Sequence, residues 1–334
     1  MKIVVSGIQS TNMLTLGNYL GAIKNFIDLQ DNHKMFVFIA DLHSITINFE
    51  PKQLEQNRKA IAAMYFACGL NIKNNLIFYQ SSIIEHSHLA YILLCHSYIG
   101  ELNRMTQFKD KSSKINQANK TVNIPSGLLT YPTLMAADIL LYDADIVPVG
   151  KDQMQHMELT KDLAIRFNKK YQTNIFKIPE IFVNKIGAKI MDLQNPEIKM
   201  SKSNPNQKGT IFLLESPTSV RKKIMSAKTD SLDKIQYDII KQPGVSNLIS
   251  IYSLISKLSI KEIETKYKNK KYGDFKNDLA DLVCQEITTI QQKYFQIIND
   301  KNFDNQIKEN NKICKKIATK KINEIHKILG LHYE

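Results

Sequence analysis

Apolar positions in the first 200 residues alternate between short continuous runs and longer periodic stretches. The short runs predict strands, at residues 2–6, 35–40, 75–80 and 145–149. In the periodic stretches apolar residues recur every three or four positions, which predicts helices at about 17–31, 52–69, 85–99, 132–143 and 151–169. Strands that alternate with helices in this way indicate an α/β fold with a parallel sheet of the Rossmann type.

The pattern changes to helical after residue 205. Long amphipathic stretches begin near Asn247, Asp274 and Asn305, and Ser216-Pro217 has the order of an N-cap and a first-turn proline. We therefore expect two domains. Residues 1–205 would form the Rossmann-type domain with an inserted helical segment. Residues 206–334 would form an all-helical domain, and its last helix could pack on the Rossmann-type domain.

Polar and small residues gather at the ends of the predicted strands. They are Ser6-Gly7, Asp41–His43, Gln80–Ser82 and Val149-Gly150. In an open parallel sheet the ligand lies beyond the carboxyl ends of the strands. The sequence therefore predicts a site at this edge.

The chain is basic, with a net charge of +13. Residues 206–334 hold 23 Lys and Arg against 15 Asp and Glu, whereas residues 1–205 hold 22 against 17. This balance favours a polyanionic partner. A composition rich in Lys, Asn and Ile and poor in Arg explains the charge equally well, so charge alone leaves RNA binding open.

The four cysteines are scattered, with no Cys-x-x-Cys pair that would indicate a zinc site or a disulfide framework. No apolar run reaches the length of a membrane span, and no signal-peptide pattern opens the chain. We therefore expect a cytoplasmic protein without a membrane partner.

The run Lys199-Met200-Ser201-Lys202-Ser203 has the chemistry of a polyphosphate contact. Two ammonium groups three residues apart can follow the charge of a triphosphate. The hydroxyl and backbone N–H groups can bind further phosphate oxygens. A solvated loop in a lysine-rich protein has the same composition, so the run alone leaves both interpretations open.

A second candidate segment lies at the first strand. The apolar run Ile3–Val5 leads through Ser6-Gly7 to a periodic stretch that begins at Leu16. A helix start presents unpaired N–H groups and a positive dipole end to an anion, and Gly17 permits close approach of a nucleotide. An ordinary strand, turn and helix with a packing glycine fits the segment as well.

Together the two segments resemble a known pair of signatures. Thr15-Leu16-Gly17-Asn18 is similar to the HIGH signature of class I aminoacyl-tRNA synthetases, in its Thr-initial form, and Lys199–Ser203 is a full KMSKS signature. Further blocks resemble the bacterial tryptophanyl-tRNA synthetases, in the order of that family, at residues 100–102, 104–109, 131–142 and 145–150. The resemblance extends to about Gly330, nearly the whole chain.

The resemblance implies a two-step reaction. The carboxylate of L-tryptophan attacks the α-phosphorus of ATP, and the 2′-hydroxyl of tRNA(Trp) then takes the tryptophanyl group. The first nucleophile is already an anion at neutral pH, so catalysis must come from positioning and from stabilising phosphoryl charge. Mg²⁺ is expected to arrive with ATP, and no tightly bound cofactor is expected. The resemblance also implies a homodimer and a helical domain that binds the tRNA anticodon.

Carried over position by position, the resemblance gives Lys199 and Lys202 contacts with the leaving pyrophosphate and the transition state. Lys111 is a third catalytic candidate, although the charged stretch from Arg104 to Lys120 fits a flexible solvated loop equally well. The implied ATP-binding residues are Gln9, Ser10, Thr11, Gly17, Asn18, Gly150, Lys151, Asp152, Ile190, Lys199, Met200, Ser201, Lys202 and Ser203.

Tryptophan recognition is expected to centre on Asp138, whose carboxylate can accept the indole N–H. Its apolar setting predicts burial, and a buried carboxylate without a partner is costly, which favours a ligand as that partner. The alternative for Met135, Val147 and Val149 is core packing, and for His43 a structural role. The implied tryptophan-binding residues are Asp138, Met135, Tyr131, Gln153, Val147, Val149, Gly7 and His43.

Several positions depart from the family's usual residues. Val5 stands in place of Phe, Lys151 in place of Glu and Asn204 in place of Asp. Gln9 is followed by Ser10-Thr11-Asn12 and not by Pro-x-Gly. The changes at Asn12 and Lys151 bear on individual ATP contacts, while the blocks that carry the resemblance are intact.

Three other functions remain open. A tyrosyl-tRNA synthetase would share the fold and both signatures, although Ser6–Gln9 and Met135–Ala137 favour tryptophan. A small HIGH-type nucleotidyltransferase would share the ATP chemistry but would not need the basic helical domain. A non-catalytic RNA-binding helical protein would explain the charge but not Lys199–Ser203.

Overall fold

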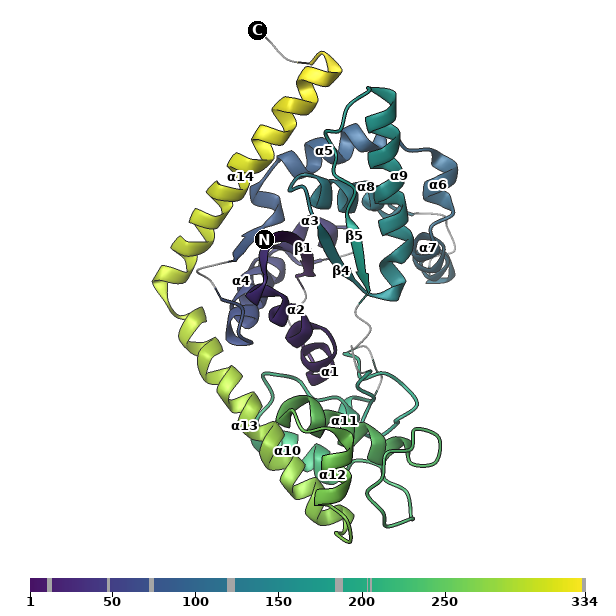
Figure 1. Cartoon of the computed structure of the whole chain (residues 1–334), viewed down its shortest axis with the longest axis vertical. Helices are drawn as coiled ribbons and strands as arrows, with labels where there is room; N and C mark the ends of the chain where they lie inside the picture. Colours follow the sequence, from purple (N-terminus) through teal and green to yellow (C-terminus); the bar gives the residue numbers. More distant parts are fainter. Residues whose placement is uncertain are drawn as a thin grey trace.

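The computed structural model describes residues 1–10, 14–46, 49–71, 75–118, 124–183, 189–202, 204 and 206–331. At its centre is a five-stranded parallel sheet in the order β3-β2-β1-β4-β5, of which Figure 1 labels β1, β4 and β5. The strands are β1 (Lys2–Gln9), β2 (His33–Ala40), β3 (Leu76–Tyr79), β4 (Ile146–Val149) and β5 (Glu180–Val183). The α/β class and the four predicted strands are confirmed. The short edge strand β5 was missed, because four residues after a proline give little periodic signal.

Helices account for most of the remaining structure. Those from the first 205 residues are α1 (Leu16–Asn18), a π-helical turn (Tyr19–Ile23), α2 (Lys24–Asp28), α3 (Asp41–Ser44), α4 (Pro51–Ala67), α5 (Glu85–Leu94), α6 (Ile99–Asn103), α7 (Thr106–Ala118), α8 (Ser126–Leu140) and α9 (Met154–Lys170). Those after residue 205 are α10 (Pro217–Met225), α11 (Pro243–Ser256), α12 (Ile260–Lys266), α13 (Tyr272–Ile298) and α14 (Lys301–Leu329). Helices α10 to α13 gather below the sheet region in Figure 1.

Successive residues of the strands pack into two different cores. Val4 and Val37 belong to a core that includes α4 and the helices after residue 205. Val5 and Phe36 belong to a second core with α5, α8 and α9. Because strand side chains alternate between faces, both faces of the sheet are covered, and the strands read as continuous apolar runs.

The last helix, α14, lies along the edge of the sheet, shown in yellow in Figure 1. Its first half contributes Phe303 to the first core, and its second half contributes Ile322 to the second. Between them, Asn310 Nδ2 donates to Ile77 O at 3.0 Å, and Asn311 Oδ1 accepts from Tyr79 N at 3.1 Å. The helix thereby satisfies backbone groups of the edge strand β3 and covers that edge.

Two predictions about helices need correction. The charged stretch around Lys111 is helix α7, and its few apolar residues made it resemble a loop. The helix expected at 132–143 begins at Ser126, so Pro132 stands inside it. A proline there lacks the N–H of one helical hydrogen bond, which favoured a later start in the sequence prediction. Across the ranges described above, no helix is long and apolar enough to cross a bilayer.

Candidate active site

A cavity of about 320 Å³ lies at the carboxyl ends of β1, β2 and β4, where the sequence predicts a site. Most of its wall is apolar, with a few polar groups converging on it, as in small-molecule sites. We call it the α8 cavity, and it is lined by Val5, Ser6, Gly7, Gln9, Phe38, Ala40, His43, Thr46, Gln107, Lys111, Tyr131, Met135, Asp138, Ile139, Val147, Pro148, Val149, Gly150 and Gln153.

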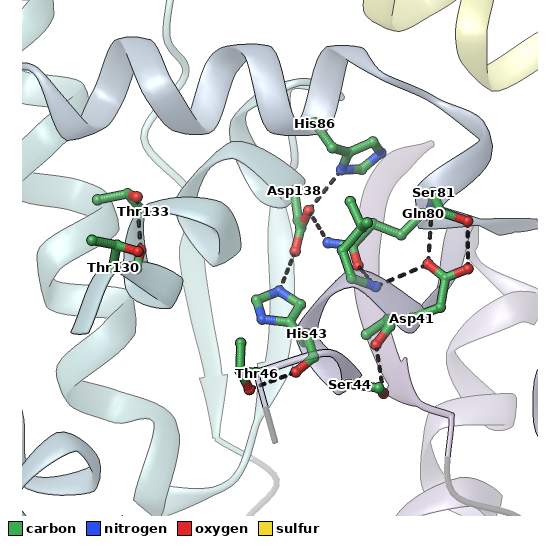
Figure 2. A network of polar contacts seen from close by, with 12 residues as sticks. Asp41, His43, Ser44, Thr46, Gln80, Ser81, His86, Thr130, Thr133 and Asp138 are labelled. Atoms are coloured by element: carbon green, nitrogen blue, oxygen red, sulfur yellow. Dashed lines mark hydrogen bonds and ion pairs between the residues drawn. The ribbon is translucent and has the colours of Figure 1, made fainter. Parts of the chain in front are cut away.

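The carboxylate of Asp138 is fully buried and takes part in three hydrogen bonds (Figure 2). Oδ1 accepts from Gln80 Nε2 at 2.7 Å and lies 2.6 Å from His86 Nδ1, while Oδ2 lies 2.8 Å from His43 Nε2. An ionised carboxylate only accepts hydrogen bonds. His43 Nε2 and His86 Nδ1 therefore each carry a proton and donate it to Asp138. Burial of Asp138 therefore does not by itself require a ligand, because protein groups already pair with both of its oxygens.

The charge state of Asp138 follows from its surroundings. Burial by itself raises the pKa of Asp138, but the hydrogen bonds from His43 and His86 outweigh burial and hold the pKa below its usual range. Tyr142 OH lies 2.7 Å from His86 Nε2, and burial raises the pKa of Tyr142 well above its usual value. Tyr142 therefore keeps its proton and can donate it to His86 Nε2, which leaves the His86 proton on Nδ1, facing Asp138.

Tyr131 is held at the cavity by a second chain of hydrogen bonds. Its hydroxyl donates to Gln107 Oε1 at 2.9 Å and lies 2.7 Å from His156 Nε2. Burial, assisted by the charge of Lys111, lowers the pKa of His156 to about 4. His156 is therefore neutral at physiological pH and donates from Nε2 to Tyr131. This chain connects α7, α8 and α9 around the mouth of the cavity.

Lys111 lies on the same side of the cavity. Its Nζ is 5.2 Å from the centre of the Tyr131 ring, and burial lowers the pKa of Lys111. At this position the charged stretch is a helix, from which Lys111 lines the cavity, and its catalytic role stays a prediction. Lys109 and Lys111 are both exposed, but Lys109 does not line the cavity.

Gly7 and Phe38 are opposite each other on β1 and β2. A Cβ on Gly7 would lie 2.5 Å from the Phe38 ring, so only glycine fits beside this ring. Gly7 is one of the residues predicted to bind tryptophan, and the structure shows that its missing side chain makes room for Phe38. The Phe38 ring in turn forms an aromatic part of the cavity wall.

A second cavity of about 320 Å³ adjoins the first and shares Gly7 and Gln9 with it. It brings the HIGH-like and KMSKS-like runs to one place. Burial lowers the pKa of Lys202 there. We call it the lysine cavity, and it is lined by Gly7, Ile8, Gln9, Leu14, Asn18, Ala22, Ile23, Tyr65, Lys199, Met200, Ser201 and Lys202.

Local hydrogen bonds fix the start of α1 at this cavity. Thr15 is the N-cap, with Oγ1 accepting from Asn18 N at 3.1 Å, and Asn18 Oδ1 accepts in return from Thr15 N at 3.0 Å. This reciprocal capping box needs a hydroxyl at Thr15 and a short polar acceptor three residues later. It places Asn18 on the cavity wall.

Residues 210–213 connect the two runs. Leu16 N donates to Ile211 O at 2.9 Å, which ties the segment to the HIGH-like run. Thr210 Oγ1 donates to Ser201 O at 3.3 Å, which ties it to the KMSKS-like run. The two runs therefore share one backbone support.

The structure brings all eight residues predicted to bind tryptophan to the α8 cavity. Of the residues predicted to bind ATP, the lysine cavity collects Gln9, Asn18, Lys199, Met200, Ser201 and Lys202, and Gly150 lines the α8 cavity. Thr11 and Ser203 lie outside the described residues, as does the side chain of Lys151.

Three predicted ATP residues line neither cavity, because their side chains are engaged elsewhere. The Ser10 hydroxyl lies 2.6 Å from Ser44 Oγ in a buried position. Ile190 is buried in the first core, and the Asp152 carboxylate accepts from Gln153 Nε2 at 3.0 Å. Gly17, the fourth ATP residue outside the cavity lining, lies against Met200. The roles of these residues in ATP binding stay predictions.

Sequence reasoning missed the residues behind the predicted ones, which are Gln80, His86 and Tyr142 at Asp138, and Gln107 and His156 at Tyr131. One signal was available: Tyr142 follows Asp138 by four positions, a spacing that puts two side chains on one helix face. Gln80 and His86 come from segments that only the folded sheet brings to Asp138.

Residues 1–287 match the family model described as tRNA synthetases class I (W and Y). The tryptophan–tRNA ligase of Malacoplasma penetrans (strain HF-2) is 62% identical over 331 residues, which cover 99% of this chain and 98% of that protein. The crystal structure of tryptophanyl-tRNA synthetase from Mycoplasma pneumoniae is similar with a TM-score of 0.87 and 40% identity, covering 99% of this chain and 98% of that one. The Campylobacter jejuni tryptophanyl-tRNA synthetase, complexed with ADP and tryptophan, has a TM-score of 0.83 and 33% identity, covering 98% and 100%.

Proposed function

The chain belongs to the class I tRNA synthetases of the tryptophan and tyrosine type, and we propose that its two cavities are the tryptophan and ATP sites of one reaction centre. The enzyme attaches L-tryptophan to its cognate tRNA in an ATP-dependent reaction that proceeds through tryptophanyl-adenylate and releases AMP and pyrophosphate.

The observation that carries the proposal is the wall shared by the two cavities at Gly7 and Gln9. With an indole in the α8 cavity and a triphosphate in the lysine cavity, the amino-acid carboxylate and the α-phosphate meet at this wall. A carboxylate oxygen then forms a bond to the α-phosphorus while the bond to the bridging oxygen breaks, and pyrophosphate leaves with that electron pair. No side-chain base is needed, because the nucleophile is already ionised.

We assign the indole to the buried end of the α8 cavity. Asp138 Oδ2 accepts the indole N–H, and Phe38 and Met135 supply apolar surface for the rings. Val147 and Val149 complete this surface from β4. Tyr131 and Gln153, which line the same cavity, bind the ammonium and carboxylate groups of the amino acid.

We assign ATP to the lysine cavity, with Mg²⁺ bound to its phosphates. Lys199 and Lys202 neutralise the charge that builds on the leaving pyrophosphate, and Ser201 and Asn18 add polar contacts. Lys111 approaches from the α8 cavity and is therefore the lysine placed to act on the α-phosphate side.

We assign residues 206–334 to tRNA(Trp) and its anticodon. The outer side of α14 supports this assignment, because exposed lysines follow it beyond its first turn, the six being Lys308, Lys312, Lys315, Lys316, Lys320 and Lys327. Within the part of the chain that the structure describes, only Lys312 of these six has a carboxylate partner, Glu309. Unpaired lysines in a row suit a phosphate backbone.

We further propose a cytoplasmic homodimer. The exposed side of α5 and the start of α6 carries large apolar side chains, with Ile84 69%, Tyr91 68% and Ile99 74% exposed. A second copy of the chain would cover such a face. The scattered cysteines suit a reducing compartment.

Pyrophosphate–ATP exchange with each proteinogenic amino acid tests the proposal. We expect the unchanged protein to catalyse exchange with tryptophan alone, and we expect Lys202→Ala to lose this exchange. Exchange with tyrosine would assign the α8 cavity to a phenol. Absence of exchange with any amino acid from a folded protein would contradict the proposed reaction centre.

A further inference from the structure

The two oxygens of Asp138 have different surroundings. Oδ1 is paired with Gln80 and His86, and both of these side chains are fully buried. Oδ2 is paired only with His43 among the described residues, and the His43 side chain is 20% exposed and lines the α8 cavity. Buried protein groups therefore donate both hydrogen bonds that Oδ1 can accept, whereas the single partner of Oδ2 lies at the cavity. A carboxylate oxygen accepts two hydrogen bonds, so Oδ2 has capacity for one further donor.

Gln80 has its amide orientation fixed at both ends. Its Oε1 accepts from Leu42 N at 3.1 Å, so its Nε2 must face Asp138. Leu42 precedes His43 on α3. One buried side chain therefore sets the position of Oδ1 and also the start of the helix that carries His43.

His86 is fixed in the same way by Tyr142. Tyr142 OH occupies His86 Nε2 at 2.7 Å, and His86 Nδ1 is then the nitrogen that donates to Asp138. The imidazole is packed among Phe38, Phe78 and Tyr142, with ring centres 5.9, 6.0 and 5.5 Å away. Neither the tautomer nor the ring direction can change without breaking a buried hydrogen bond.

We propose that Gln80, His86 and Tyr142 are positioning residues for tryptophan recognition, which anchor Asp138 through Oδ1 so that Oδ2 is presented to the indole N–H. The inference rests on the proposed role of Asp138 as the indole acceptor. None of the three positioning residues lines the α8 cavity, so their effect on tryptophan is exerted through Asp138.

The anchoring matters because a carboxyl group can either accept or donate. A protonated Asp138 would place an O–H against the indole N–H and lose the bond. The titratable groups around Asp138 are His43 from α3, His86 from α5 and, behind His86, Tyr142 from the turn that follows α8. Glu85, also on α5, acts on Tyr142 by its charge. Removing a donor to Oδ1 therefore raises the pH at which Asp138 becomes protonated.

The test compares Tyr142→Phe, His86→Leu and His86→Asn with the unchanged enzyme. The chain contains no tryptophan, so the fluorescence of bound substrate tryptophan reports binding directly. Tyr142→Phe should weaken tryptophan binding about 3- to 10-fold, with the KM for ATP unchanged. His86→Leu should weaken it more, and His86→Asn should restore most of the loss, because its amide can donate where Nδ1 does.

The readout that separates positioning from general destabilisation is the pH profile. In Tyr142→Phe the acid limb of kcat/KM for tryptophan should move to higher pH by about half a unit. Phe78→Leu is the control, because Phe78 packs against the same two rings but forms no hydrogen bond with its side chain. It should lower the melting temperature and leave the acid limb in place.

Failure of the positioning role can be distinguished from failure of the proposed indole contact at Asp138. In one outcome Asp138→Asn weakens tryptophan binding, while folded Tyr142→Phe and His86→Leu bind tryptophan normally and leave the acid limb in place. This outcome overturns the positioning role but leaves Asp138 as the indole acceptor. If Asp138→Asn itself binds tryptophan normally, the assignment of the indole to Asp138 fails first. An equal shift of the acid limb in Phe78→Leu would also overturn the positioning role.

Discussion

Gly17 of the HIGH-like run lies directly against Met200 of the KMSKS-like run. A Cβ on Gly17 would be 3.2 Å from Met200 Cβ and 3.5 Å from Met200 O. The glycine at this position therefore sets how closely the two signatures approach. Because Asn18 and Lys202 line the same cavity, this spacing also sets the width of the proposed ATP site.

Gly17→Val should push the segment that carries Met200 away from α1. We expect the KM for ATP to rise about tenfold, since overpacking by a branched side chain typically costs about 1–3 kcal/mol. The KM for tryptophan should change little. Gly273→Val is the matched control, because Gly273 is also helical and has no atom within 4 Å of its would-be Cβ. Equal KM values for ATP in the two variants would contradict the contact.

Lys202 should determine the alkaline side of the ATP profile. Burial lowers the pKa of Lys202, so its charge is lost at lower pH than that of a free lysine. Pyrophosphate exchange as a function of pH should therefore fall on the alkaline side, and Lys202→Arg should move this fall to higher pH. Lys202→Ala should reduce kcat by about 10²–10³-fold, as for removal of a preorganised charge contact. An alkaline limb that Lys202→Arg does not move would exclude Lys202 as its origin.

His156 should make the fold sensitive to mild acid. Its pKa is about 4 in the folded protein, whereas a histidine in the unfolded chain titrates near about 6.5. Between these two values the unfolded state binds more protons than the folded state. The contribution of His156 to the free energy of unfolding is therefore fully present above about pH 6.5 and is lost as the pH drops toward 4. The loss is on the order of 2–3 kcal/mol.

The measurement for His156 is the melting temperature between pH 4 and 7. His156→Gln, whose amide can still donate to Tyr131, should flatten the profile in this range. His96→Gln is the comparison, because His96 also bonds a tyrosine hydroxyl, that of Tyr171. A profile for His156→Gln as steep as that of the unchanged protein would show that another group causes the acid sensitivity.

The exposed apolar face of α5 and α6 should be the dimer contact. Introducing charge with Tyr91→Glu and Ile99→Glu should convert a homodimer into a monomer, because buried unpaired carboxylates are costly. Light scattering at micromolar concentration measures the change. Ile240→Glu is the control, since Ile240 is 91% exposed but lies outside α5 and α6. A monomeric unchanged protein would contradict the proposal at once.

Much of the sheet could be predicted from the sequence, because buried parallel strands such as Met35–Ala40 are continuous apolar runs with turn residues at their ends. β5 could not, since four edge residues carry little signal. α7 could not either, because its residues are mostly polar and its cavity-facing side chains, Gln107 and Lys111, have meaning only beside α8.

The candidate site divides in the same way. The side chains at the cavities follow motifs that are contiguous in sequence, and so Asp138 and Lys202 could be named. The groups that hold them could not, because Gln80 and His86 reach Asp138 only through the strand order β3-β2-β1-β4. Ser10 shows what a motif leaves out: its place in the run predicts an ATP contact, but only the fold reveals the buried hydrogen bond between its hydroxyl and Ser44 Oγ.

Tryptophan binding by Asp138→Asn, followed by the fluorescence of the substrate, tests the central claim most directly. The loss of a charged acceptor in a buried site should cost about 2–4 kcal/mol, which raises the dissociation constant for tryptophan roughly 30- to 900-fold. Asp281→Asn, at an exposed ion pair with Arg221, should bind normally. Folded Asp138→Asn that binds tryptophan as tightly as the unchanged enzyme would contradict the account of this site.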